Sequence, residues 1–97
     1  GDLDRLGGEI AATRAEIDRR WFDGVTSIGT TPTFGGTESV IESHLFTDWH
    51  DFYSRPIRLR FYERIREQRK FESPDALRLQ IQSDVESARE VLSRIPA

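Results

Sequence analysis

A ten-residue run near the middle of the chain, IRLRFYERIR at residues 57–66, alternates apolar and charged side chains almost without interruption. A period of two is the repeat of a β-strand, whose successive side chains point to opposite faces of a sheet. One face is expected to enter a core, and the arginine face is expected to meet solvent or a ligand. The expected core face carries Ile57, Leu59, Phe61 and Ile65. Because the backbone of a strand needs other strands as hydrogen-bond partners, the run predicts a sheet.

Three further segments supply the neighbours that this strand needs. Residues 10–18 and 19–28 alternate less regularly and are expected to form two strands joined by a polar hairpin. A third strand is expected at residues 38–46, after the glycine-rich stretch GTTPTFGG at residues 29–36, which is expected to be a wide connection. Short strands must protect their edges, and closing into a barrel is a usual solution.

The last segment has the repeat of a helix. Ser73 is expected to cap it, Pro74 suits its first position, and Asp75 complements the helix dipole. Apolar residues then recur at spacings of four, four, three and four and are expected to form one stripe along the helix: Leu77, Ile81, Val85, Ala88 and Leu92. Polar residues are expected outside the stripe, namely Arg78, Gln82, Asp84 and Glu86. The predicted fold class is therefore mainly β, a small antiparallel sheet or barrel closed by one C-terminal helix.

Length and composition narrow the class of protein. Ninety-seven residues suit a single domain, expected to span residues 1–97 with residues 1–7 as a frayed lead-in. No apolar run approaches the roughly 20 residues of a membrane span, and no secretion signal opens the chain, so no membrane association is expected. The absence of cysteine fits a reducing compartment, and a cytoplasmic location is expected. A formal charge of -3 gives no bulk electrostatic reason to bind nucleic acid.

The glycine-rich stretch is not a phosphate-binding loop of the Walker type. That loop requires a lysine directly after its last glycine, whereas Gly36 is followed by Thr37. No helix follows the stretch either, so no helix N-terminus is available to bind phosphate.

Glu42 lies between Val40 and His44 on one face of the third expected strand. Such a carboxylate either faces a polar cleft, where it could act as a general base, or simply meets water on a half-exposed sheet. The residues alone leave both readings open. The two histidines, His44 and His50, have no regular ligand spacing, so no metal site is expected within the chain.

Residues 55–70 carry many more basic than acidic side chains. Arg66, Arg69 and Lys70 are expected in the loop before the helix, directly ahead of Phe71. A cationic loop that ends in an aromatic ring could hold a planar anionic ligand. Solvated arginines are equally common in loops, so this alternative also stays open.

In their order along the chain, four blocks of these segments resemble the riboflavin kinase domain, most closely that of bacterial bifunctional riboflavin kinase/FMN adenylyltransferases. The blocks are SIGTTPTFGG (27–36), SVIESHLF (39–46), DFYSRPIRLRFYERIREQRKF (51–71) and SPDALRLQIQSDVESARE (73–90). The resemblance covers residues 8–93. It implies a six-stranded Greek-key split β-barrel with a C-terminal helix, and a reaction in which ATP, with Mg²⁺, phosphorylates riboflavin to FMN.

The resemblance also implies roles for single residues. Glu42 matches the family's catalytic glutamate, which implies that it acts as the general base. Positions similar to those that line the nucleotide are Leu45, Thr47 and Tyr53. Positions that match the flap over the flavin and its new phosphate are Arg66, Arg69 and Phe71. An N-terminal FMN adenylyltransferase domain is an implied partner.

One departure from the family pattern matters. A G-x-P-T-A-N motif, whose Thr and Asn hold Mg²⁺ and the ATP phosphates, is expected upstream of Gly8 and is absent from this chain. The chain therefore resembles a kinase domain whose first strands are missing, and it is expected not to phosphorylate riboflavin alone. Two alternatives remain: a non-catalytic flavin- or nucleotide-binding barrel, and an interaction module whose arginine face contacts an acidic partner.

Overall fold

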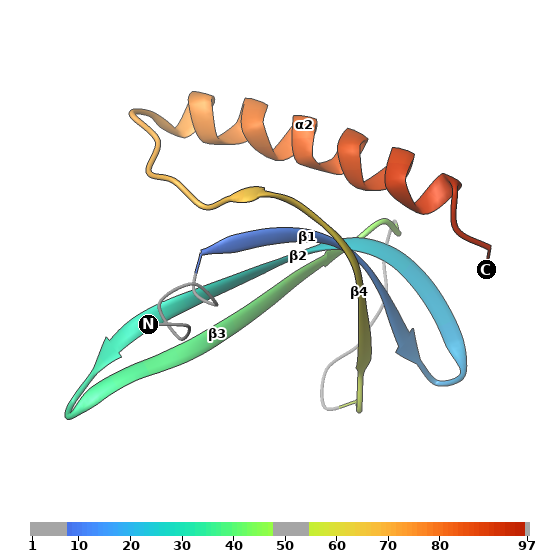
Figure 1. Cartoon of the computed structure of the whole chain (residues 1–97), viewed down its shortest axis with the longest axis horizontal. Helices are drawn as coiled ribbons and strands as arrows, with labels where there is room; N and C mark the ends of the chain where they lie inside the picture. Colours follow the sequence, from blue (N-terminus) through green and yellow to red (C-terminus); the bar gives the residue numbers. More distant parts are fainter. Residues whose placement is uncertain (1–7, 48–54, 97) are drawn as a thin grey trace.

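The computed structural model describes residues 8–47 and 55–96, so the expected lead-in at residues 1–7 lies outside the described residues. The elements are β1 (Glu9–Ile17), β2 (Arg20–Thr33), β3 (Gly36–Leu45), β4 (Arg58–Glu67) and α2 (Pro74–Ser93). The strands form one antiparallel sheet in the order β3-β2-β1-β4. Three consecutive strands followed by a fourth that returns beside the first form a Greek key. The predicted mainly β fold with a C-terminal helix is confirmed, and α2 packs along one side of the curved sheet (Figure 1).

The predicted hairpin between the first two strands is confirmed. Ile17 pairs with Arg20, which leaves Asp18 and Arg19 as the two turn residues. Their φ angles are 52° and 66°, and positive φ at both central positions is the requirement of a type I′ turn. This turn matches the right-handed twist of the flanking strands.

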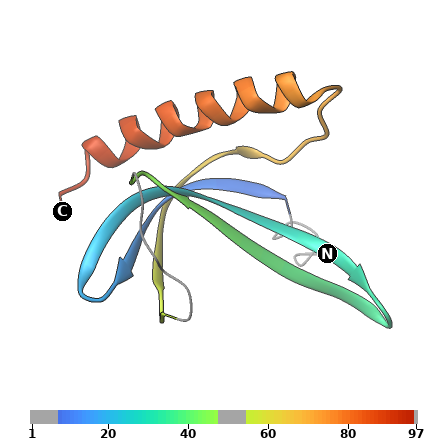
Figure 2. The ribbon, with the colours of Figure 1, turned by 180° about the vertical axis from the view of Figure 1, so that it is seen from behind.

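The expectation that residues 29–36 form a wide connection is wrong. Strand β2 continues to Thr33 and pairs there with Gly36, so only Phe34 and Gly35 remain as a turn. Beyond Ile28, β2 has only β3 as a described neighbour, so Pro32 interrupts no hydrogen bond to β1. The result is a long two-stranded arm that projects from the rest of the fold (Figures 1 and 2).

The strict alternation expected in the fourth strand is interrupted twice. Its pairing with β1 shifts between Ile10 and Ala11 and again between Ala12 and Thr13, so β4 carries two extra residues, Ile65 and Tyr62. Such bulges change which face of the sheet is met by the side chains on either side of them. As a consequence Phe61, expected in the core, is 47% exposed, whereas Tyr62 packs against the core. Ile57, also expected in the core, lies before β4 and is 49% exposed.

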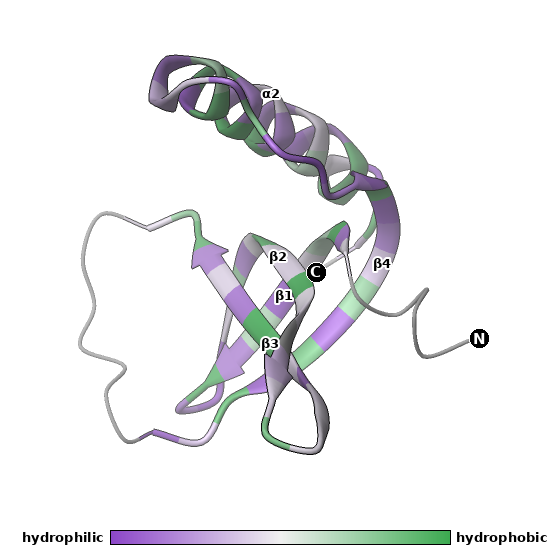
Figure 3. Ribbon diagram, turned by 90° about the vertical axis from the view of Figure 1, so that its left-hand side faces the viewer, coloured by the Kyte–Doolittle hydropathy of each residue, from purple (hydrophilic) through white to green (hydrophobic). Residues whose placement is uncertain are grey.

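The core lies between α2 and one face of the sheet, and its buried members are Ile10, Ala12, Val25, Ala88 and Leu92. The predicted helix start is confirmed, because the Ser73 hydroxyl accepts a hydrogen bond from the Ala76 N–H at 3.1 Å and Pro74 opens the helix. Hydrophobic and hydrophilic residues both colour α2 in Figure 3, as expected of a helix with one buried face. In the part of the chain that the structure describes, no helix is long and apolar enough to cross a membrane.

Two features of α2 differ from the expected stripe. Leu77 and Ile81 are 41% and 44% exposed, because they lie in the N-terminal half of α2, which the core does not cover. Asp84, expected outside the stripe, is only 4% exposed. Its burial is explained by an arginine of the sheet, described with the site below.

The C-terminal end of α2 is held by Arg14 of β1. The last carbonyl groups of a helix lack partners within the helix, and the last turn of α2 contains no basic residue. The buried Arg14 guanidinium donates to the carbonyl oxygens of Leu92, Ile95 and Pro96 at 2.8–2.9 Å. It also donates from Nε to Asp23 at 2.9 Å, which raises the pKa of Arg14 against the opposing effect of burial.

Candidate functional site

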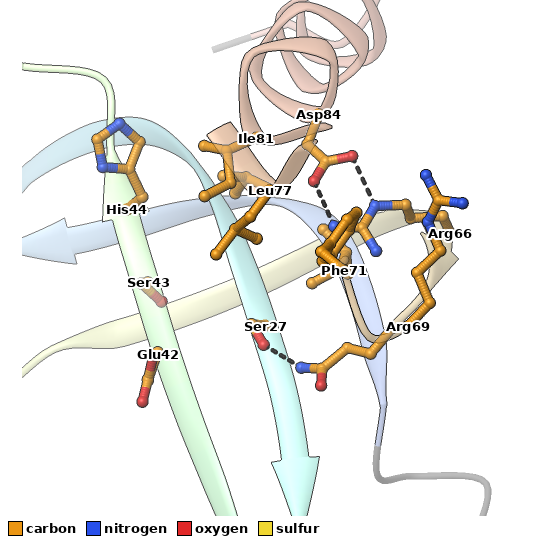
Figure 4. Close-up of a pocket in the computed structure, with 13 residues that line it drawn as sticks. Ser27, Glu42, Ser43, His44, Arg66, Arg69, Phe71, Leu77, Ile81 and Asp84 are labelled. Carbon is orange, nitrogen blue, oxygen red and sulfur yellow. Dashed lines mark hydrogen bonds and ion pairs between the residues drawn. The ribbon is translucent and has the colours of Figure 1, made fainter. Parts of the chain in front are cut away.

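A cleft of about 550 Å³ opens between the sheet, the start of α2 and the connection that joins β4 to α2 (Figure 4). From the sheet it is lined by Ile10, Val25, Ser27, Glu42, Ser43, His44 and Arg66. From the connection and the helix it is lined by Gln68, Arg69, Phe71, Leu77, Ile81 and Asp84. The cleft therefore combines an acidic group on one strand, a cationic and aromatic wall, and two exposed apolar side chains of the helix.

A second, smaller cleft of about 250 Å³ adjoins the first. Its lining residues are Ser27, Gly29, Thr30, Val40, Glu42 and Gln68. Three of these, Ser27, Glu42 and Gln68, line both clefts. The Gln68 side-chain amide donates to the Ser27 hydroxyl and thereby joins the connection after β4 to β2. Glu42 thus lies where an apolar-walled cleft meets a polar one.

The pairing of β2 with β3 explains the position of Glu42. Ser27 is directly opposite Glu42, and Val25 is directly opposite His44. Because side chains alternate along a strand, these four residues lie on the face that borders the cleft. The Glu42 side chain is exposed, so its carboxylate is accessible to a ligand in either cleft.

The cationic wall is organised around Phe71. The guanidinium carbons of Arg66 and Arg69 lie 5.6 Å and 4.9 Å from the centre of its ring. Both distances are in the range of a cation–π interaction. Arg66 forms an ion pair with Asp84, whereas Arg69 donates to the neutral amide of Gln80 at 2.9 Å. Within residues 8–47 and 55–96 no carboxylate pairs with Arg69, so its positive charge is not offset by an ion pair.

Four of the predicted site residues therefore lie around the same cleft: Glu42, Arg66, Arg69 and Phe71. Arg66 was expected both as the last residue of the strand at 57–66 and as part of the loop that follows; it lies in β4, where its strand backbone fixes its direction. Leu45 and Thr47 line neither cleft; Leu45 pairs with Gly24 at the end of β3, and the Thr47 N–H donates to the Leu45 carbonyl at 2.9 Å. Tyr53 and His50 lie outside the described residues. No group of three acidic or histidine side chains able to hold a metal ion occurs in the described part of the chain.

Sequence reasoning missed Asp84 and Gln68. Asp84 occurs seven residues, or about two helical turns, after Leu77, so it lies on the same side of the helix as the apolar stripe. A carboxylate on that side is a signal for a buried partner. No comparable signal exists for Gln68, because a glutamine after a strand is an ordinary surface residue.

Comparison with known families gives one clear match. A family model described as "Flavokinase: Riboflavin kinase" matches residues 9–92. A bifunctional riboflavin kinase/FMN adenylyltransferase of Haemophilus influenzae is 38% identical over 68 residues, covering 70% of this chain and 22% of the relative. The corresponding protein of Bacillus subtilis is 33% identical over 89 residues, covering 89% of this chain and 28% of the relative. A riboflavin kinase of Eremothecium gossypii is 31% identical over 83 residues, covering 84% of this chain and 45% of the relative.

The chain thus spans less than half the length of each of these relatives. Among solved structures, a protein described as a macrolide-efflux protein from Streptococcus pneumoniae superposes with a TM-score of 0.79 and 30% sequence identity. The superposition covers 84% of this chain and 27% of that one. It supports the mainly β fold with a C-terminal helix.

Proposed function

The chain belongs to the riboflavin kinase family, and from this premise we propose that it forms part of an enzyme that transfers the γ-phosphate of ATP to riboflavin. The products are FMN and ADP. The observation that carries the proposal is the place of Glu42 at the junction of two clefts that differ in character. Since the chain spans less than half of its relatives, the complete activity is assigned to the full-length protein.

We assign the flavin to the larger cleft. A flat aromatic ring suits a pocket walled by Phe71, Leu77 and Ile81, and cations near that wall suit a phosphate ester formed on the same molecule. Arg66 and Arg69 are the proposed phosphate-facing cations. We assign the nucleotide to the end of β3, through Leu45 and Thr47 and, outside the described residues, Tyr53.

In this arrangement Glu42 acts as the general base. The terminal ribityl hydroxyl oxygen attacks the γ-phosphorus, and a new oxygen–phosphorus bond forms. At the same time the bond from the γ-phosphorus to the bridging oxygen breaks, and ADP leaves with that electron pair. The hydroxyl proton passes to the Glu42 carboxylate. In such a transfer the protein mainly aligns the two substrates and neutralises the negative charge of the phosphates, and the cationic wall supports the second of these roles.

Mg²⁺ accompanies ATP in the proposal because the family resemblance implies it. The described residues do not form a site for it: no set of three acidic or histidine side chains gathers in residues 8–47 and 55–96, and Asp84 is already paired with Arg66. No step is therefore routed through a metal held by these residues.

Three further parts of the proposal concern the whole protein. Residues 8–93 form one kinase-type domain, an FMN adenylyltransferase domain accompanies it as in the bifunctional relatives, and the protein acts in the cytoplasm. The family match and the names of the bacterial relatives support the first two parts, and the absence of cysteine is consistent with the third.

The test is an assay of FMN formation from riboflavin and ATP with Mg²⁺, using the chain expressed with the coding sequence upstream of Gly1. We expect ATP-dependent FMN formation by that protein and none by the 97-residue chain alone. A folded full-length protein that forms no FMN would overturn the proposal. Flavin binding without turnover would favour a non-catalytic barrel, whereas salt-sensitive binding of an acidic partner without flavin affinity would favour an interaction module.

A further inference from the structure

Asp84 is a carboxylate buried at the wall of the larger cleft. Removing a charged carboxylate from water is costly unless the protein supplies a partner and hydrogen bonds. Arg66 supplies both: its Nε donates to Asp84 Oδ1 at 2.8 Å and its terminal nitrogen donates to Oδ2 at 2.7 Å. This is the two-point geometry that orients an arginine most strictly. Figure 4 shows the pair facing one another across the gap between α2 and β4.

The remaining contacts of Arg66 complete its immobilisation. Its other terminal nitrogen donates to the Glu67 carbonyl at 2.9 Å, so each of its three nitrogen atoms has a partner. Its side chain is only 18% exposed. The plane and position of the guanidinium beside Phe71 are therefore set by protein groups, and Asp84 supplies two of the three hydrogen bonds.

The second cation of the wall is connected to the same carboxylate. Gln80 donates from its amide nitrogen to Asp84 at 3.0 Å and accepts from Arg69 through its amide oxygen at 2.9 Å. Gln80 and Asp84 are four residues apart, hence neighbours on the helix surface. Both arginines that contact Phe71 thus depend on Asp84, one directly and one through Gln80.

We propose that Asp84 is a positioning residue for flavin binding, holding Arg66 and, through Gln80, Arg69 against Phe71 before a ligand arrives. This inference rests on the proposed function and adds a residue to it. A binding wall that is already ordered loses less side-chain freedom when a ligand binds, which strengthens affinity. The packing of α2 on the sheet has separate support in Ala88 and Leu92, so helix attachment alone does not require a buried ion pair.

The first test compares flavin affinity in the full-length protein and its variants by fluorescence titration with riboflavin and FMN. Asp84→Asn keeps the shape of the side chain but removes its charge, and we expect it to weaken FMN binding about tenfold. Arg66→Gln should weaken binding at least as much. The double variant should lose less affinity than the sum of the two single losses, because much of the effect of Asp84 passes through Arg66 and only the rest through Gln80 and Arg69. Additive losses, or unchanged affinity in Asp84→Asn, would overturn the inference.

Leu92→Val is the control for a general loss of stability. Leu92 is buried in the core but does not line the cleft. We expect this variant to lower the midpoint of urea unfolding while its FMN dissociation constant stays within about twofold of the parent. Equal losses of affinity in Leu92→Val and Asp84→Asn would show that Asp84 acts only through stability.

The second test needs no flavin and therefore separates this inference from the proposed function. In the ligand-free chain, the NMR signal of the Arg66 Nε–H, assigned by its loss in Arg66→Gln, should be resolved and slow to exchange with water. Asp84→Asn should abolish that protection and Leu92→Val should retain it. If the full-length protein binds neither riboflavin nor FMN, the proposed function and the flavin-binding role fail together. An Arg66 signal that persists in Asp84→Asn refutes the positioning of Arg66 alone.

Discussion

Glu42 is exposed on β3 and borders both clefts, so its carboxylate has room to accept a proton from a substrate hydroxyl. In the full-length protein we expect Glu42→Gln to lower kcat by roughly 10²–10⁴-fold, because an amide cannot take that proton. Riboflavin affinity should stay close to that of the parent, since the change removes neither the aromatic wall nor its cations. Steady-state kinetics and a flavin fluorescence titration measure the two effects separately.

Glu38→Gln provides a matched control for this substitution. Glu38 lies on the same strand and is also exposed, but it lines neither cleft. Its variant should keep the parent kcat. A full rate in Glu42→Gln would remove Glu42 from the role of base, whereas equal losses in both variants would point to a disturbance of β3.

At this scale the sequence identified side chains better than their surroundings. Glu42, Arg69 and Phe71 were singled out mainly because they match a family pattern, and the structure brings the three around one cleft, while their roles stay predictions. The partners of Arg66 could not be predicted, because a bulge in β4 decides which way that side chain points and bulges leave no clear mark in an alternating sequence. The helix repeat could have marked Asp84 as buried, but its partner could not be named until Arg66 was known to face it.

Among the elements, α2 was the most predictable, because the residues at its start have strong local preferences for a helix cap and first turn. Ser73, Pro74 and Asp75 occupy the cap and first turn as expected. The β2–β3 arm was the least predictable. Glycine, proline and threonine in residues 29–36 suggested a loop, yet β-branched threonines also suit a strand, and pairing with β3 decided in favour of the strand.

The cap of α2 gives a prediction for the element as a whole. Ser73→Ala removes the hydroxyl that accepts from the Ala76 N–H, and we expect the free energy of unfolding to fall by about 1 kcal/mol. The matched control is Ser83→Ala, an exposed position inside the same helix, where alanine should be neutral or stabilising by a few tenths of a kcal/mol. Urea unfolding followed by circular dichroism measures both variants. Equal stabilities would mean that the first turn frays and that the cap contributes little.

For the molecule as a whole, the helix is attached to the sheet by the apolar core and by two arginines from adjacent strands. Arg66 of β4 reaches the middle of α2 through Asp84, and Arg14 of β1 reaches its C-terminal end. The core lies between these two polar contacts. The Greek-key order places β1 beside β4, and this brings two residues far apart in the sequence to one helix. Such long-range pairing explains why neither contact could be predicted from local patterns.

Arg14 tests this attachment. Arg14→Met keeps much of the apolar volume but leaves Asp23 and the carbonyls of Leu92, Ile95 and Pro96 without their donor. We expect the free energy of unfolding to fall by about 2–4 kcal/mol, because one buried and several part-buried acceptors lose a charged partner. The control is Arg58→Met on β4, where the side chain is 84% exposed and its ion pair with Glu16 is loose, so the change should stay within about 0.5 kcal/mol.

The pH dependence of this contact follows from the sign of the shift. The pKa of Arg14 is raised in the folded protein, chiefly by its hydrogen bond to Asp23, so the folded state binds this proton more tightly than the unfolded state does. The stability that the charge contributes is therefore fully present below the ordinary pKa of arginine and is lost only as the pH rises through the raised value. For this reason the titration of Arg14 should not change the difference in the free energy of unfolding between the parent and Arg14→Met across neutral pH. Urea unfolding at several pH values measures this difference. A loss no larger than that of Arg58→Met would show that water replaces Arg14 at the end of α2, and that the core and the Arg66–Asp84 pair suffice to hold the helix to the sheet.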